Sequence, residues 1–211
     1  MLTDSPPRKA NCAGFLETDR IKTFDLPQDG CLLRCAKSIE SAMKAGTSVD
    51  ARRACAEFLA LASGFYRVST PGIRVLAARP LKVRESWATE LFGDYNPETM
   101  LIRLWMRTAV RNEITSFGTF LSTMCHEFCY HLDFQRLRFL DSWHTRGFYE
   151  RTATLSTMHG GHRQSDCSGC QYRAGAGGSI GRQRIAMRDP SGFRGSSYLC
   201  SIYRNVRLIR G

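Results

Sequence analysis

The sequence predicts an α+β domain in which helices come first, a small sheet follows, and a long helix comes after the sheet. Apolar residues recur at helical spacing over residues 31–64 and again from about residue 116. Between these regions, short β-prone runs are separated by Pro and Gly. Strands and helices do not alternate, which argues against repeated β-α-β units and favours helices packed on a small sheet.

Two neighbouring helices are expected before the sheet. The first covers residues 31–44, where apolar side chains share one face, and Gly46 follows at a position typical of a helix C-terminus. The second begins near Thr47 or Ser48 and continues to Gly64, and the spacing of Thr47 to Asp50 resembles a capping box. We therefore expect a helical pair.

The sheet is expected between residues 74 and 108. Residues 74–78 and 81–85 form short β-prone runs. Residues 88–95 and 100–108 flank the turn-forming segment Asn96-Pro-Glu-Thr. This arrangement predicts a β-hairpin, followed by the long helix from about Ser116 to Arg136.

The long helix has two sides of different character. The side expected to pack on the sheet carries Phe117, Phe120, Leu121, Met124, Phe128, Leu132 and Gln135. The side expected to face a cleft carries Thr119, Thr123, His126, Glu127 and Tyr130. The polar side is therefore the place to look for chemistry.

The segment His126-Glu127-Phe-Cys-Tyr130-His131 lies in this helix. In zinc hydrolases with a His-Glu-x-x-His motif, two histidines four positions apart reach one ion, and the glutamate deprotonates the zinc-bound water. Here Tyr130 occupies the position of the second histidine, and a phenol can bind zinc only after it ionises. His131 lies about 140° around a regular helix from His126, so only a local π-bulge would bring it to the position of the missing ligand.

A third ligand is expected from the segment Trp143-His144-Thr-Arg-Gly147-Phe148. A short turn after the long helix would fold His144, at the start of a following helix, back over His126. Glu150 lies one or two turns further along and is the competing third ligand.

Taken together, residues 65–155 resemble the SprT-like zinc metallopeptidases, in which His-Glu-x-x-His is followed by a later His-x-x-x-Phe and preceded by a small sheet. The resemblance implies a zincin-like fold, a Zn²⁺ cofactor and hydrolysis of peptide bonds in a protein or peptide substrate. It assigns His126 as the first zinc ligand, Glu127 as the general acid/base and His144 as the third ligand. Tyr130 departs from the family at the second ligand.

The departure at Tyr130 leaves two functions open. One is a zinc-dependent metallopeptidase that Tyr130 impairs. The other is a catalytically inactive zincin-like module that binds protein or nucleic acid through a basic tail. Stoichiometric zinc and cleavage that depends on Glu127 would distinguish the first from the second.

The positive charge is concentrated at the C-terminal end. The chain of 211 residues has a formal net charge of +11. Residues 1–155 contain 21 Lys and Arg against 17 Asp and Glu, a net charge of +4, whereas residues 156–211 contain nine Arg and two Asp, a net charge of +7. We therefore divide the chain into an N-terminal extension (1–30), a SprT-like zincin domain (31–155) and a poorly ordered Gly/Arg-rich tail (156–211), which is a candidate for nucleic-acid binding.

The sequence also indicates a compartment. The N-terminus has no apolar run typical of a signal peptide, and nowhere do eighteen apolar residues follow one another. The nine cysteines are odd in number, and several fall within apolar helical patterns, which favours reduced thiols. We expect a soluble cytoplasmic protein without a membrane partner.

Overall fold

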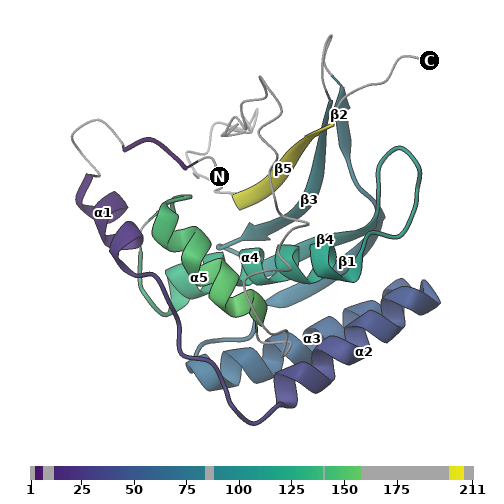
Figure 1. The fold of residues 1–211 in the computed structure, drawn as a ribbon, viewed down its shortest axis with the longest axis horizontal. Coiled ribbons are helices and arrows are strands. Elements are labelled where there is room, and N and C mark those ends of the chain that lie inside the picture. Colours follow the sequence, from purple (N-terminus) through teal and green to yellow (C-terminus); the bar gives the residue numbers. More distant parts are fainter. Residues whose placement is uncertain (1–2, 7–11, 84–87, 140, 158–199, 207–211) are drawn as a thin grey trace.

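The computed structural model describes residues 3–6, 12–83, 88–139, 141–157 and 200–206, the last range as backbone only (Figure 1). These residues form an α+β arrangement, as predicted. The helices are α1 (Cys12–Arg20), α2 (Cys31–Ala45), α3 (Ser48–Tyr66), α4 (Phe117–Gln135) and α5 (Arg146–Ser156). The strands are β1 (Gly72–Ala78), β2 (Leu81–Val83), β3 (Ala88–Asn96), β4 (Leu101–Arg107) and β5 (Cys200–Val206).

Helices α2 and α3 form the predicted helical pair and lie side by side (Figure 1). Gly46 ends α2 with a φ of 75°, a left-handed conformation that glycine adopts without strain. The predicted capping box at Thr47 is wrong. The Thr47 hydroxyl is directed at the Asp50 carboxylate, 2.8 Å away, and accepts no hydrogen bond from the backbone of α3. Attraction to the charged carboxylate competes with the backbone contact that a capping box requires.

The sheet is mixed, with the strand order β1-β4-β3-β2, and β5 also pairs with β3. Strands β3 and β4 are antiparallel, which confirms the predicted hairpin. Its turn is held by the Asn96 side chain, whose Oδ1 accepts from the backbone N–H groups of Glu98 and Thr99 at 2.9 and 3.0 Å. Strand β1 is parallel to β4, and β2 is antiparallel to β3.

Helix α4 packs against β3, β4 and α5, and its N-terminus is capped by Ser116, which accepts from the Thr119 N–H. The expectation of a polar side facing a cleft is wrong for this helix. The exposed fractions of His126, Glu127 and Tyr130 are 7%, 0% and 2%. Strand β3 and helix α5 cover this side, so α4 is a central core helix.

Gly93 of β3 explains how α4 comes so close to the sheet. A Cβ atom at this position would lie 2.6 Å from Cγ2 of Thr123 and 3.2 Å from Cγ of Glu127. Any larger residue would therefore push α4 away from β3. Because Gly93 has no side chain, α4 lies close to β3, and Glu127 is enclosed between them.

The described cysteines are free thiols, and Cys55, Cys125 and Cys129 belong to the buried core. The buried cysteines thus act as small core residues, as their apolar helical patterns predict. Burial raises the pKa of Cys125 to about 12, so this thiol stays protonated at neutral pH. None of the described helices is both long and apolar enough to cross a membrane. Apart from β5, the predicted basic tail lies outside the described residues beyond residue 157, so its disorder and nucleic-acid binding stay predictions.

Candidate active site

Three sequence-predicted site residues come together between α4 and the start of α5. His126 and Tyr130 are one turn apart on α4, and His144 lies two residues before α5. Nε2 of His144 is 3.2 Å from Nε2 of His126 and 2.7 Å from the hydroxyl of Tyr130. The ring of Phe148 packs against all three side chains, with centroid distances of 4.8, 4.8 and 5.3 Å to His126, Tyr130 and His144. We call His126, Tyr130 and His144 the His-Tyr-His cluster.

Nε2 of His144 cannot form full hydrogen bonds with both of its close neighbours at once. A neutral imidazole has one donor nitrogen and one acceptor nitrogen, and the acceptor has a single lone pair in the ring plane. Nε2 of His144 faces two polar atoms, one on His126 and one on Tyr130. Burial and the neighbouring His144 ring hold the pKa of His126 well below its ordinary value, so His126 is neutral. The cluster therefore places the uncharged ring of His126 close to Nε2 of His144.

The segment that carries His144 is held in place by a network of buried polar contacts. Arg151 of α5 forms an ion pair of 2.8 Å with Asp133 of α4, and both side chains are fully buried. The same Asp133 oxygen accepts from the Ser142 hydroxyl at 2.6 Å. Thr145, the next residue after His144, caps α5 by accepting from the Phe148 N–H at 3.1 Å. These contacts fix both ends of the short segment that carries His144.

Glu127 lies on the sheet side of α4, against Gly93. Neither of its carboxylate oxygens has a hydrogen-bond partner among the described residues. Burial raises the pKa of Glu127 well above its ordinary value, and the nearby Asp94 carboxylate raises it further. The Asp94 carboxylate forms an ion pair with Arg103, which donates to both its oxygens at 2.8 and 2.6 Å. Both effects favour the neutral form of the Glu127 carboxyl group.

His131 and Glu150 lie away from the cluster. The Nε2 of His131 donates to the Ser69 carbonyl at 2.8 Å, so its Nδ1 accepts from the Tyr95 hydroxyl at 2.9 Å. Both nitrogens of His131 are thus used, and its ring stacks on Phe128 as the helical spacing predicts. Glu150 pairs with Arg146 at 2.7 Å. Of the two candidates for the third ligand, the structure brings His144 to His126.

The donor set can be compared with what zinc requires. No group of three His, Cys, Asp or Glu suited to a metal occurs in the part of the chain that the structure describes. The His-Tyr-His cluster instead combines two imidazoles with a phenol. Two nitrogens bound to one tetrahedral zinc at 2.0–2.1 Å are about 3.3 Å apart. The 3.2 Å between the Nε2 atoms of His126 and His144 matches this spacing, so the pair fits zinc while the third donor is a weak one.

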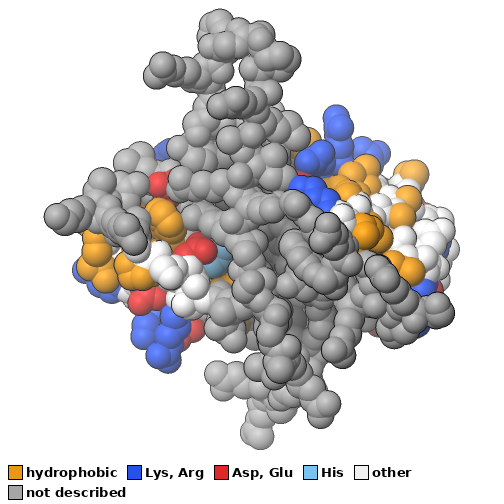
Figure 2. All heavy atoms as spheres, turned by 90° about the horizontal axis from the view of Figure 1, so that it is seen from above, with side chains coloured by type: hydrophobic (Ala, Val, Ile, Leu, Met, Phe, Trp, Pro, Cys, Tyr) orange, Lys and Arg blue, Asp and Glu red, His pale blue; other side chains and the backbone are white. Residues whose placement is uncertain are grey.

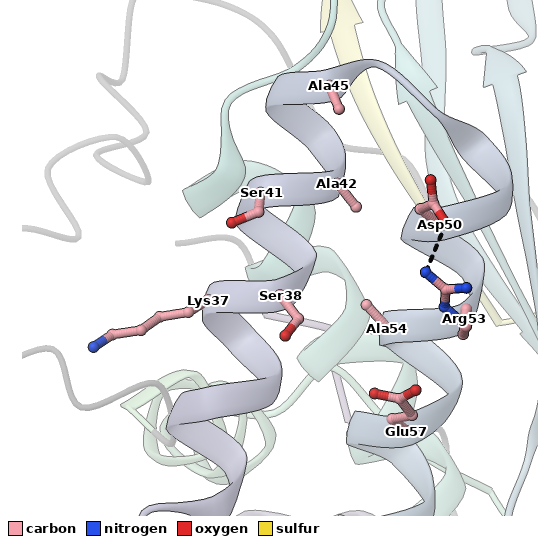
Figure 3. A pocket seen from close by; sticks show the side chains of 9 residues that line it. All are labelled: Lys37, Ser38, Ser41, Ala42, Ala45, Asp50, Arg53, Ala54 and Glu57. Carbon is pink, nitrogen blue, oxygen red and sulfur yellow. Dashed lines mark hydrogen bonds and ion pairs between the residues drawn. The ribbon is translucent and has the colours of Figure 1, made fainter.

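Other surface features lie elsewhere. A groove of about 560 Å³ lies between α2 and α3, away from the His-Tyr-His cluster (Figure 3). Its lining residues are Lys37, Ser38, Ser41, Ala42, Ala45, Asp50, Arg53, Ala54 and Glu57. No histidine is among the described residues that line the groove, whereas Figure 2 shows a histidine side chain beside an acidic side chain on one face of the molecule. The groove has none of the chemistry that the sequence predicts.

One contact of the site has no signal in the sequence. Asp4, from the N-terminal segment, accepts through Oδ2 from the backbone N–H of His144 at 2.9 Å. The two residues are 140 positions apart, and no motif surrounds Asp4. Sequence reasoning therefore missed it.

Comparison with known proteins identifies no matching family model, no similar curated protein and no similar solved structure. The likeness to SprT-like metallopeptidases thus remains an interpretation of the residues 65–155 and their spacing.

Proposed function

We propose that this chain is a zinc-dependent peptidase of the SprT-like type in which the second metal ligand is altered. The observation that carries the proposal is the 3.2 Å approach of the Nε2 atoms of His126 and His144. Two imidazole nitrogens at this spacing, with a buried glutamate next to one of them in the chain, are groups that metal-assisted hydrolysis uses.

In this proposal His126 and His144 hold the metal, and Tyr130 stands at the second ligand position. When bound, zinc supplies Lewis-acid chemistry, which lowers the pKa of water and polarises a carbonyl group. The ionised form of Glu127 accepts a proton from the attacking water and returns it to the leaving amine. Its burial and the Asp94 carboxylate raise the pKa of Glu127, which makes its ionised form a stronger base. Phe148 and the enclosing helices keep bulk water from the imidazoles.

Tyr130 sets the expected strength of zinc binding. A phenol must lose its proton before it binds a metal, whereas a neutral imidazole is ready to bind. In addition, the Tyr130 hydroxyl forms a 2.7 Å hydrogen bond with Nε2 of His144, which competes with the metal for that nitrogen. We therefore propose weak zinc binding and low activity for the chain as it stands, and a gain of both on substitution Tyr130→His.

The experiment compares purified wild type, Tyr130→His, Tyr130→Phe and the double variant Tyr130→His/Glu127→Gln. Zinc content is measured by elemental analysis, and cleavage by release of labelled fragments from an unfolded protein substrate. Tyr130→His is expected to bind close to one zinc and to cleave. The double variant is expected to keep the zinc and lose cleavage, because Glu127 moves protons and binds no metal. Absence of zinc from both wild type and Tyr130→His would refute the proposal.

Tyr130→Phe is the control for the hydroxyl. It frees Nε2 of His144 from its 2.7 Å partner but adds no ligand. If Tyr130→Phe gained as much zinc as Tyr130→His, the hydroxyl would merely block the site, and the second ligand position would be unimportant.

The alternative is a catalytically inactive zincin-like module that binds protein or nucleic acid. The observation that favours it is the same Tyr130–His144 hydrogen bond, which engages Nε2 of one of the two imidazoles. Binding of the full chain to labelled DNA at about 50 and 200 mM salt tests its nucleic-acid form, since contacts to phosphates weaken steeply with salt. Salt-sensitive DNA binding, combined with no zinc and no cleavage, would favour this function.

A further inference from the structure

Asp4 makes three contacts with His144. Its backbone N–H donates to the His144 carbonyl at 3.0 Å, and its Oδ2 accepts from the His144 N–H at 2.9 Å. The same Oδ2 lies 3.7 Å from Nδ1 of the His144 ring. The exposed fractions of the two side chains are only 16% and 19%, so solvent screens their interaction in part. Asp4 therefore holds the backbone of His144 and also acts electrostatically on its ring.

The rest of the N-terminal segment is attached to the same region. The Asp19 carboxylate accepts from the Gly147 N–H at 2.9 Å, at the first turn of α5. Arg151 donates to the Thr18 carbonyl at 2.7 Å, inside the buried network. The ring of Phe15 packs against Trp143, the residue before His144, with centroids 6.0 Å apart. The N-terminal segment thus belongs to the packing that surrounds His144.

The charge of Asp4 bears on which ring nitrogen of His144 carries the proton. A carboxylate near Nδ1 favours a hydrogen on Nδ1, and this leaves the lone pair on Nε2. That lone pair is directed at His126 and Tyr130, because Nε2 is the atom that approaches both. In metal-binding histidines a carboxylate commonly accepts a hydrogen bond from the other ring nitrogen, which fixes the tautomer and the ring orientation. At 3.7 Å, Oδ2 of Asp4 acts on Nδ1 of His144 through its charge.

We propose that Asp4 is a positioning residue that holds His144 with Nδ1 protonated and Nε2 presented to the His-Tyr-His cluster. The role toward a metal rests on the proposed zinc function, whereas the effect on the tautomer does not. Loss of such a supporting carboxylate typically weakens metal binding by about 10- to 100-fold. The N-terminal segment, which carries no motif, then sets the zinc affinity of a site 140 residues away.

Two substitutions separate the hydrogen bond that the Asp4 side chain accepts from the His144 N–H from the effect of the Asp4 charge on the His144 ring. Asp4→Asn keeps a side-chain oxygen that can accept from the His144 N–H, but it removes the charge. Asp4→Ala removes both. Glu17→Gln is the matched control, because it removes one carboxylate from an exposed position of the same N-terminal segment.

The first measurement uses zinc-free, full-length protein and needs no activity. Long-range nitrogen–proton NMR correlations of the histidine rings report which nitrogen is protonated. We expect the Nδ1-protonated form for His144 in wild type and in Glu17→Gln. Asp4→Asn and Asp4→Ala are expected to shift His144 toward the other tautomer, and the unchanged signals of His131 would show that the fold is intact. The same His144 tautomer in all four proteins would overturn the proposal.

The second measurement is zinc affinity, determined by competition with a coloured chelator in the Tyr130→His background. Asp4→Asn is expected to lower the affinity by about 10- to 100-fold, and Glu17→Gln to leave it unchanged. Equal affinities for Asp4→Asn and its parent would overturn the metal-directed part. If the parent binds no zinc, the proposed function fails, and the tautomer measurement alone decides the role of Asp4.

Discussion

Replacement of Glu127 by Gln tests the unusual environment of this carboxyl group. The exposed fraction of Glu127 is 0%, and neither oxygen has a described hydrogen-bond partner. Burial is the main cause of its raised pKa, with the Asp94 carboxylate second. Because the native protein binds this proton more tightly than the unfolded chain, the contribution of Glu127 to stability is fully present below the unfolded pKa of about 4.3. It is lost as the pH rises toward the native pKa.

The expected effect is a change in the free energy of unfolding with pH. Between the unfolded and native pKa values, one proton is taken up on folding, so the free energy of unfolding falls by about 1.4 kcal/mol per pH unit as the pH rises. Glu127→Gln has no titrating group at this position. The difference in stability, variant minus wild type, should therefore increase by about 1.4 kcal/mol per pH unit above about pH 4.3.

Because of the buried histidines, the difference in stability between variant and wild type is more informative than the pH dependence of either protein alone. Burial lowers the pKa values of His126 and His131, so their contribution to stability is lost as the pH falls below about 6.5. Their slope opposes that of Glu127 and partly hides it in wild type. Both histidines are present in wild type and variant, so they cancel in the difference.

The assay is urea denaturation between about pH 4 and pH 8, with a chelator present so that no metal contributes. Glu17→Gln, in the exposed part of α1, serves as the control and should give a flat difference from wild type. A flat difference for Glu127→Gln, or one that falls with rising pH, would refute the argument that Glu127 is a buried neutral acid.

Two further substitutions test the packing that holds His144. Gly147→Ala should destabilise the protein by about 1–3 kcal/mol, because its Cβ would lie 2.3 Å from the Asp19 carbonyl oxygen; Gly118→Ala, the second residue of α4 with nothing within 4 Å, should be neutral or stabilising. Equal thermal midpoints for the two variants would contradict this. Asp133→Ala leaves Arg151 buried without its carboxylate, so urea denaturation should show a loss of about 3–5 kcal/mol. A loss below about 1 kcal/mol would mean that the ion pair matters little.

The local elements were predictable because their signals lie within a few residues. Apolar periodicity indicates the helices around residues 31–64 and 116–136, and the turn at Asn96 indicates the β-hairpin. The spacing of His126 and Tyr130 also predicts that they share one side of a helix, and the structure places them one turn apart. Only the capping box at Thr47 failed among these local features, because its outcome depends on one competing side chain.

The burial of α4 was not predictable in the same way. Its polar positions indicate an exposed side, yet Gly93 of β3 and Phe148 of α5 come close enough to enclose it. Glu127 becomes a neutral buried acid only through this approach. Amphipathic spacing describes one helix, whereas burial depends on which elements cover it.

The sequence by itself determined that His126, Glu127 and Tyr130 lie within about one turn of the same helix, with His144 a short loop away. Covalent spacing and helical geometry are sufficient for that. Tertiary structure decided which of His144 and Glu150 reaches His126, and it brought Asp4 to His144 across 140 residues. Packing selects such contacts, because groups distant in the chain meet only where the burial of apolar surface and the pairing of buried polar groups favour one arrangement.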